Sequence, residues 1–301
     1  MRALVTGATG FVGPHLLRLL DRPVLLSRDV ERARQQFKEF NPQVYRWDVL
    51  KGPPPLEAFD GVDTVLHLAG DPVASGRWTA EKKQRIRETR ELGTRHLVQA
   101  IGQLPQRPKV LVSSSATGWY GDHDDQILDE TSPPADDFLG QVCVAWEREA
   151  QAAAQFFVRV VSIRTGIVLG REGGALKQLL PPFRVGVGGP LGNGRQWMPW
   201  IHVDDLAALY VFAAEHANLS GPLNGCSPNP VTNKQFTKSL AATLHRPAIF
   251  PVPYFALRVA LGAFAKVLFD SQRVLPKATL AGGFQFQYPE LGPALAAILP
   301  R

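Results

Sequence analysis

Three hydroxyl-bearing side chains lie close together in the sequence, where an apolar run ends in polar residues. The run from Lys109 to Ser115 has the character of a buried strand, and Ser114 and Ser115 are its last residues. Ligands of open α/β sheets bind beyond the carboxyl ends of the strands, so a hydroxyl there can hydrogen-bond a substrate carbonyl or hydroxyl. Tyr120 follows in Gly-Trp-Tyr-Gly and can exchange a proton through its phenol. Ser115 and Tyr120 are therefore the candidate catalytic residues.

A glycine-rich stretch near the amino terminus has the spacing of a nucleotide-binding loop. Gly7, Gly10 and Gly13 follow an apolar run that predicts a strand, and they precede leucines at helical spacing. Such a loop lets the backbone approach a pyrophosphate, which accepts hydrogen bonds from free N–H groups where the helix begins. A tight turn without a ligand has the same spacing, so the motif alone leaves both interpretations open. The cofactor-binding residues expected in this loop are Gly7, Thr9, Gly10, Phe11, Val12 and Gly13.

The end of the second predicted strand, Pro23 to Ser27, indicates which dinucleotide would bind. An acidic residue there accepts from the ribose 2′-hydroxyl of NAD, whereas an arginine accommodates the 2′-phosphate of NADP. Ser27 and Arg28 stand at this place, and a planar guanidinium suits a phosphate dianion. Asp29 follows, and it would restore a preference for NAD if the strand ended later. The sequence thus predicts NADP(H) as the preferred cofactor, with NAD(H) possible.

Further cofactor contacts are expected at the ends of other strands. Asp48 follows an apparent strand and can accept from the adenine amino group, or it can simply cap a turn. Small residues end the fourth strand in His-Leu-Ala-Gly, and they let its backbone run close to a cofactor. Asp48, Leu68, Ala69, Gly70 and Ser114 are therefore added to the candidate cofactor-binding residues.

Short apolar runs alternate with helical patterns along the first half of the chain, and a glycine- and proline-rich segment follows. This alternation predicts a parallel sheet with helices on both faces. The predicted fold class is α/β, a Rossmann-type doubly wound parallel sheet with a smaller C-terminal substrate-binding lobe. Residues 1–170 would form the NADP(H)-binding Rossmann domain, and residues 171–301 a mixed region. Within that region, residues 198–225 would complete the sheet, while 171–197 and 226–301 would form the lobe.

Composition narrows the classes of partner. The 301-residue chain has a formal net charge of +6 at pH 7, but its basic residues are scattered or mixed with acids, so nucleic-acid binding is not expected. Cys143 and Cys226 are too few for a disulfide framework or a metal cage, and no metal site is predicted. The first residues lack a signal-peptide pattern, and the apolar segment from Tyr254 to Phe269 is too short to span a bilayer. We expect a cytoplasmic protein without a membrane span, in which this segment packs as an amphipathic helix.

Substrate contacts are expected in the glycine-rich segment that follows the nucleotide-binding half. Arg195 and Gln196 can clamp an anionic or hydroxyl-rich group, and Trp197 can supply an apolar wall. His202 and the two aspartates that follow it are interpreted as residues that join the second lobe to the first.

Five motifs, in this order, resemble those of extended short-chain dehydrogenases/reductases: TGATGFVG, HLAG, SSSATGWYG, IRTGIVLG and WIHVDDLA. The chain is most similar to an atypical epimerase-like subgroup with a C-terminal block of unknown function. That subgroup includes bacterial NAD(P)-dependent epimerase/dehydratase family proteins and cell-division factors of the giant-chloroplast type. The resemblance covers essentially the whole chain and implies a Rossmann-type fold and NADP(H), but no particular substrate.

The chain departs from this superfamily at the residues that usually transfer the proton. Members usually carry Tyr-x-x-x-Lys on the helix after the serine strand, whereas Leu139 and Cys143 stand at these two positions. Ser115 matches the superfamily serine, and Tyr120 is the leading replacement for the missing acid. The alternative for Tyr120 is a tyrosine that only packs beneath its loop.

The sequence leaves two main hypotheses for function. The first is an NADP(H)-binding oxidoreductase or epimerase-like protein that acts by hydride transfer on an unidentified small polar substrate, a carbonyl compound or a sugar-like molecule. The second is a non-catalytic or weakly catalytic NADP(H)-binding regulator of a protein partner, which predicts an exposed apolar patch on the C-terminal block. A nucleotide-sugar epimerase would need a pocket for a second nucleotide, for which no convincing residues are found. A monomer or homodimer is expected.

Overall fold

Seven short strands form the central sheet of the structure, a computed structural model that describes residues 1–299. The strands are β1 (Ala3–Thr6), β2 (Val24–Ser27), β3 (Gln43–Arg46), β4 (Thr64–His67), β5 (Val110–Ala116), β7 (Arg159–Thr165) and β11 (Gly221–Gly225). Their order is β11-β7-β5-β4-β1-β2-β3, and every pairing is parallel. The strand order reverses between β1 and β4, which creates the crevice where Rossmann folds bind dinucleotides. The predicted α/β, doubly wound parallel sheet is confirmed.

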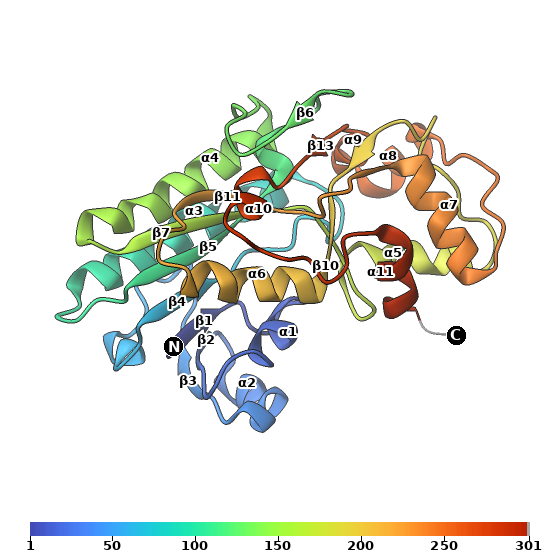
Figure 1. The fold of residues 1–301 in the computed structure, drawn as a ribbon. Helices are drawn as coiled ribbons and strands as arrows, with labels where there is room; N and C mark the ends of the chain where they lie inside the picture. The colour runs from blue at the N-terminus through green and yellow to red at the C-terminus, as the bar shows by residue number, and fades with distance from the viewer. Residues whose placement is uncertain (300–301) are drawn as a thin grey trace.

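Helices cover both faces of the sheet, so the strand side chains are buried alternately on the two sides (Figure 1). On β1, Leu4 packs toward one face, whereas Ala3 and Val5 pack toward the other. The first face is covered by α3 (Ala80–Gln103) and α4 (Phe138–Gln151). The opposite face is covered by α1 (Gly13–Leu17), α2 (Val30–Gln36) and α6 (Val203–Glu215).

The C-terminal lobe has an apolar cluster of its own. Leu176, Phe236 and Leu295 belong to this cluster, and each comes from a different helix. The helices of the lobe are α5 (Gly174–Arg184), α7 (Asn233–Leu244), α8 (Tyr254–Leu261), α9 (Phe264–Val267) and α11 (Leu291–Ile298), whereas α10 (Lys277–Ala281) packs against β11 of the sheet. Small strand pairs accompany it: β6 (Ile127–Leu128) with β13 (Arg273–Val274), β8 (Ile167–Leu169) with β10 (Trp200–His202), and β9 (Trp197–Met198) with β12 (Val231–Thr232). The 3-10 helices are η1 (Lys38–Phe40), η2 (Leu56–Phe59), η3 (Thr117–Trp119) and η4 (Ala152–Phe156).

Residues at the start of α6 attach the last part of the chain to the sheet. The Asp205 carboxylate accepts hydrogen bonds from the backbone N–H groups of Gln287 (2.7 Å) and Tyr288 (2.9 Å). The His202 ring stacks on Tyr288 with centroids 4.0 Å apart. These contacts support the interpretation of this motif as a joint between the lobes.

The apolar segment from Tyr254 to Phe269 forms two short helices rather than one. Gly262, with φ +64°, separates α8 from α9. Phe264 of α9 is buried, whereas Phe255 and Val259 of α8 are exposed. The expectation of a packed amphipathic helix is thus wrong for α8. Within residues 1–299, no helix combines the length and the apolar character needed to cross a membrane.

Candidate cofactor and catalytic site

The amino-terminal loop needs glycine because other backbone passes very close to it. Gly7 has φ +72°, and a Cβ atom there would lie 2.7 Å from the carbonyl carbon of Leu68. A Cβ atom on Gly13 would lie 1.7 Å from the carbonyl oxygen of Ala8. The Gly10 N–H donates to the Gly7 carbonyl (2.9 Å) and closes the turn. Only glycine fits Gly7 and Gly13 without a shift of the backbone.

The end of β4 lies directly against this loop. The backbone N–H of Leu68 donates to the Thr6 carbonyl, and that of Ala69 donates to the Thr6 hydroxyl, both at 3.2 Å. His67 is fully buried and bonds Thr6 (2.7 Å) and Thr94 (3.0 Å) through its two ring nitrogens. Burial lowers the pKa of His67 to about 3, so the ring is neutral. The structure therefore brings the glycine loop and the predicted Leu68–Gly70 segment together.

At the end of β2, the side chains of Ser27 and Asp29 bond nearby backbone groups, whereas the Arg28 side chain is exposed. The Ser27 hydroxyl donates to the Asp29 carbonyl (3.0 Å). The Asp29 carboxylate accepts from the Arg32 N–H (3.1 Å) and caps α2. Arg28 is exposed, and its guanidinium has no hydrogen-bond or ion-pair partner within residues 1–299. β2 ends at Ser27, as the NADP prediction requires, and the carboxylate that could favour NAD is used in the cap.

Five other predicted cofactor residues have surroundings that spacing did not reveal. The Ser114 hydroxyl hydrogen-bonds Tyr210 of α6, so it is already partnered. Asp48 accepts from the Leu50 N–H (3.2 Å), which supports its interpretation as a turn residue. The Phe11 ring lies against Gly170, Gly173 and Gly174, where it fills the space that side chains would need. Val12 caps α1 through its backbone, and Thr9 is exposed.

Ser115 belongs to a buried chain of polar groups at the carboxyl end of the sheet. Its hydroxyl donates to Glu147 Oε1 of α4 (2.6 Å). The Arg164 guanidinium of β7 meets the same carboxylate with two bonds, Nε to Oε1 at 2.9 Å and Nη2 to Oε2 at 3.0 Å. Burial opposes the charge on Arg164, but its bonds to Glu147 raise the guanidinium pKa overall. Because the Ser115 proton points to Glu147, the serine oxygen can act as an acceptor for a substrate hydroxyl.

Tyr120, the predicted replacement acid, is enclosed by other protein groups. Its side chain is fully buried, and its hydroxyl donates to Asn224 Oδ1 (2.7 Å) and accepts from Arg164 (3.2 Å). Burial raises the Tyr120 pKa well above its usual value, which makes the phenol a poorer acid. Tyr120 instead packs beside Leu128, so the alternative interpretation, a packing tyrosine, fits the structure.

The positions of the missing tyrosine and lysine are occupied without any equivalent chemistry. Leu139 packs in an apolar cluster with Trp78 and Phe264. Cys143 is buried, its thiol lies 3.6 Å from the Ala116 carbonyl oxygen, and burial raises its pKa to about 12. A neutral thiol therefore stands where a cation usually does. The positive charge that acts on this thiol comes from an arginine of α3.

That arginine, Arg90, lies between the end of β4 and α4. Its Nη1 donates to the carbonyls of Asp71 (2.9 Å) and Ile86 (3.1 Å). Its guanidinium carbon lies 4.8 Å from the Trp146 ring centroid, and a Cβ atom on Gly70 would lie 3.2 Å from that carbon. Burial lowers the pKa of Arg90 to about 10, against the opposing effects of Cys143 and Asp71. Arg90 thus places a charge beside the predicted cofactor segment.

The predicted substrate residues have mainly structural contacts. Gln196 is buried, and its amide donates to the carbonyls of Leu191 (3.2 Å) and Leu268 (3.4 Å). The Trp197 indole donates to Asp125 (2.7 Å). Arg195 is exposed, with no side-chain bond within the described part of the chain. The Gln196 amide thus joins two loops, whereas the Arg195 guanidinium is exposed, and a role of either residue in substrate binding stays a prediction.

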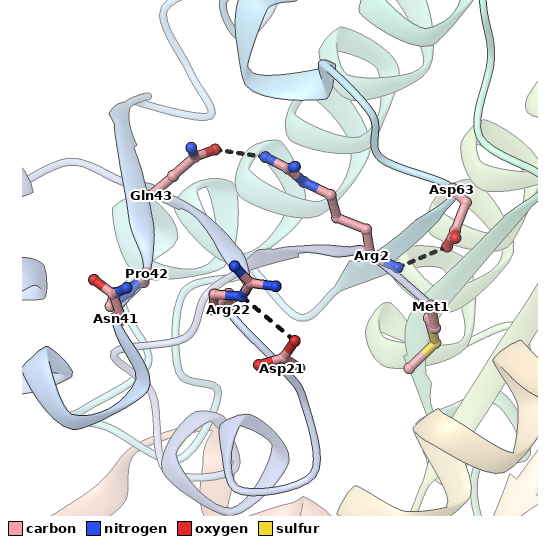
Figure 2. A pocket seen from close by; sticks show the side chains of 8 residues that line it. All are labelled: Met1, Arg2, Asp21, Arg22, Asn41, Pro42, Gln43 and Asp63. Carbon is pink, nitrogen blue, oxygen red and sulfur yellow. Dashed lines mark hydrogen bonds and ion pairs between the residues drawn. The ribbon is translucent and has the colours of Figure 1, made fainter.

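A hollow of about 580 Å³ lies at the amino ends of the strands, opposite the site described above (Figure 2). Its lining includes Arg2, Arg22, Gln43 and Asp63, which precede or begin β1, β2, β3 and β4. Arg2 is tied to Gln43 and Asp63 across it. Because ligands of parallel sheets bind at the carboxyl ends of strands, this hollow is separate from the site described above.

Sequence reasoning missed Glu147, Arg164, Asn224 and Arg90. One signal was available: Arg164 stands in an otherwise apolar strand, and a buried arginine needs a partner. The sequence does not say that this partner is Glu147 on α4 or that Asn224 of β11 holds Tyr120.

The parallel sheet, its reversal point and the glycine loop define a Rossmann-type protein of the dinucleotide-binding class. The model of the NAD dependent epimerase/dehydratase family matches residues 3–224, and a domain of unknown function, DUF1731, matches residues 252–298. The chain belongs to the NAD dependent epimerase/dehydratase family.

Relatives of similar length support this assignment. "Epimerase family protein YfhF" of Bacillus subtilis is 38% identical, over 99% of this chain and 98% of the relative. "Epimerase family protein SDR39U1 homolog, chloroplastic" of Arabidopsis thaliana is 40% identical, over 99% and 87%. A crystal structure of human epimerase family protein SDR39U1 (isoform 2) with NADPH superimposes with a TM-score of 0.87 and 35% identity, covering 99% of both chains. The resemblance to an epimerase-like subgroup with a C-terminal block of unknown function is thus confirmed.

Proposed function

We propose that this protein binds NADP(H) and acts as an oxidoreductase or epimerase-like enzyme on a small polar substrate with a carbonyl or hydroxyl group. The observation that carries the proposal is the contrast at the end of β2: Asp29 is used in a helix cap, while the Arg28 guanidinium is exposed and has no partner among residues 1–299. The human relative crystallised with NADPH agrees with this cofactor preference. NAD(H) stays possible, as the family description indicates.

The residues present fit a dinucleotide. The close backbone approaches at Gly7 and Gly13 leave no room for side chains, as expected of a phosphate cradle. Arg28 and Ser27 would meet the adenosine phosphate, and the backbone of Leu68–Gly70 would border the cofactor. The remaining residues proposed to contact the cofactor are Thr9, Gly10, Phe11, Val12, Asp48 and Ser114. When bound, the nicotinamide would give or take a hydride at the substrate carbon.

Ser115 and Glu147 are proposed to handle the substrate proton. A substrate hydroxyl would donate to Ser115 Oγ, whose own proton already points to Glu147 (2.6 Å). Proton transfer to Ser115 can then be matched by transfer of the serine proton to Glu147. The two bonds from Arg164 hold that carboxylate in place. Arg90 supplies the positive charge that Cys143 does not, and Arg195 is the proposed contact for a polar substrate group.

The direct test combines nucleotide titration with turnover. NADPH and NADH are titrated into the protein by calorimetry, and NADPH oxidation is followed with a panel of small carbonyl compounds and sugars. We expect tighter binding of NADPH than of NADH, and turnover of at least one panel member that Ser115→Ala and Glu147→Gln reduce by about 100-fold. Absence of binding by either nucleotide contradicts the cofactor assignment. Equal turnover by wild type and both variants contradicts the proton path.

The regulator hypothesis is not favoured, since the family match and the relatives' names are those of epimerases. The exposed apolar side chains of Phe255 and Val259, which lie within the DUF1731 match, nevertheless require an explanation of their own.

A further inference from the structure

The far end of the C-terminal lobe exposes apolar side chains from three segments. Ile249 and Phe250 are 73% and 74% exposed, and Phe255 and Val259 of α8 are 71% and 74% exposed. Residues 255 and 259 are one helical turn apart and share a face of α8. The apolar patch consists of Val185, Val187, Ile249, Phe250, Phe255 and Val259.

Backbone contacts hold the segments of the apolar patch together. The Arg246 Nε donates to the Arg184 carbonyl (3.0 Å), and the Val252 N–H donates to the Pro190 carbonyl (2.8 Å). The Gly192 N–H donates to the Val252 carbonyl (3.0 Å). The patch is therefore an assembled surface, although an apolar helix such as α8 is normally covered.

The charge of the segments around the apolar patch indicates what kind of partner binds there. Residues 173–203 and 216–269 contain eight lysines and arginines and no aspartate or glutamate. The rest of the chain has 25 lysines and arginines against 27 acids, so the positive net charge lies in these segments. Arg184, Arg246 and Arg258 are exposed beside the patch.

A combination of protruding apolar side chains and flanking cations matches the interface of an anionic bilayer. A second copy of this lobe would bring like charges together. A nucleic acid would satisfy the charge but leave Phe255 and Val259 in water. We propose that the apolar patch docks this protein on membrane surfaces rich in anionic phospholipid, with Phe250, Phe255 and Val259 entering the headgroup region and the arginines contacting lipid phosphates. This inference goes beyond the proposed function and is independent of it.

Vesicle flotation tests the proposal. Wild-type protein should float with vesicles of equal parts phosphatidylglycerol and phosphatidylcholine, and bind pure phosphatidylcholine at least about tenfold more weakly. Phe255→Ser/Val259→Ser should reduce binding by about tenfold or more. The matched control is Phe157→Ser, which removes a side chain that is 95% exposed on the sheet domain and should leave binding unchanged.

A double variant that removes two arginines separates the electrostatic contribution to vesicle binding from the apolar one. Arg184→Ser/Arg258→Ser should weaken binding roughly fivefold for each arginine at low salt, whereas Arg18→Ser/Lys38→Ser, at exposed sites of the sheet domain, should not. Unchanged thermal unfolding and NADPH affinity in all variants would show that fold and cofactor site are intact. Failure of the wild type to float, or equal flotation of the apolar variant, overturns the proposal. A wild-type dimer that the apolar variant converts to monomer would also overturn it, because a second copy would then cover the patch.

Discussion

The two halves of the candidate site use their polar groups in opposite ways. Around the glycine loop, close backbone approaches create a cradle, and the Arg28 side chain is exposed to solvent. At the ends of β5 and β7, Ser115, Glu147 and Arg164 bond one another in a buried network. The first region is organised to receive a ligand by its backbone, whereas the second is organised around internal charge.

This difference explains why the superfamily proton-transfer pair can be absent while the cofactor loop is retained. The glycine cradle depends on close backbone approaches, which do not require particular side chains at the ends of β5 and β7. A buried charge network is more constrained, because removal of one member leaves another unpaired at low dielectric. Five measurements test this contrast.

The largest effect is expected from Arg164→Met. Arg164 is 2% exposed and donates two bonds to Glu147, so its removal leaves a buried carboxylate unpaired. The free energy of unfolding should fall by about 3–5 kcal/mol, measured by urea denaturation. The control is Arg148→Met, which removes an ion pair to Glu149 from a side chain that is 65% exposed, and should cost less than about 1 kcal/mol. Equal losses in the two variants would refute the network.

Gly13→Ala tests the glycine cradle, and its expected effect on NADPH binding is nearly as large in free energy. Its Cβ would lie 1.7 Å from the Ala8 carbonyl oxygen, so the loop must open. NADPH affinity should fall by about 100-fold, or about 3 kcal/mol, in a fluorescence titration. Gly292→Ala is the control, since its Cβ would have no neighbour within 4 Å. Retained affinity in Gly13→Ala would show that the loop does not bind the phosphates.

The same contrast explains how far the sequence could be read. The alternation of strands and helices predicted the parallel sheet, and the glycine spacing predicted a strand, loop and helix at the amino terminus, because both depend on local patterns. The bond from Tyr120 to Asn224 spans 104 positions, and no spacing rule indicates it. α8 was misjudged for a related reason: its apolar pattern predicts burial, but only the assembled lobe shows which side is left uncovered.

The free energy of unfolding at acidic pH depends on His67, which hydrogen-bonds Thr6 beside the glycine cradle. Its pKa is about 3 in the folded protein against 6.5 when unfolded, so unfolding binds a proton below pH 6.5. Its contribution to stability is complete above pH 6.5 and is lost as pH falls toward 3, at about 1.4 kcal/mol per unit. Between pH 7 and pH 5 we expect a loss of about 2 kcal/mol, from urea unfolding at each pH. His67→Gln should flatten this slope, whereas His216→Gln, at an exposed site, should leave it unchanged.

Arg28→Ala tests the assignment of the phosphorylated cofactor. Loss of charge-assisted bonds to a 2′-phosphate should weaken NADPH about 10- to 30-fold and leave NADH unchanged. The matched control for loss of one surface charge is Arg32→Ala, in the first turn of α2. A parallel fall in both affinities would mean that Arg28 acts on stability or on general charge rather than on the phosphate.

The smallest effect is expected from Tyr120→Phe, which distinguishes a packing tyrosine from an acid. The change keeps the buried ring and removes the bonds to Asn224 and Arg164, so stability should fall by only about 1 kcal/mol. Tyr45→Phe, whose hydroxyl has no hydrogen bond within residues 1–299, should be neutral. NADPH affinity should match wild type, and turnover of a panel substrate should change less than about threefold with an unaltered pH profile. A loss of about 100-fold, the size expected for a general acid, would return Tyr120 to the chemistry and show that the network at β5 and β7 opens during the reaction.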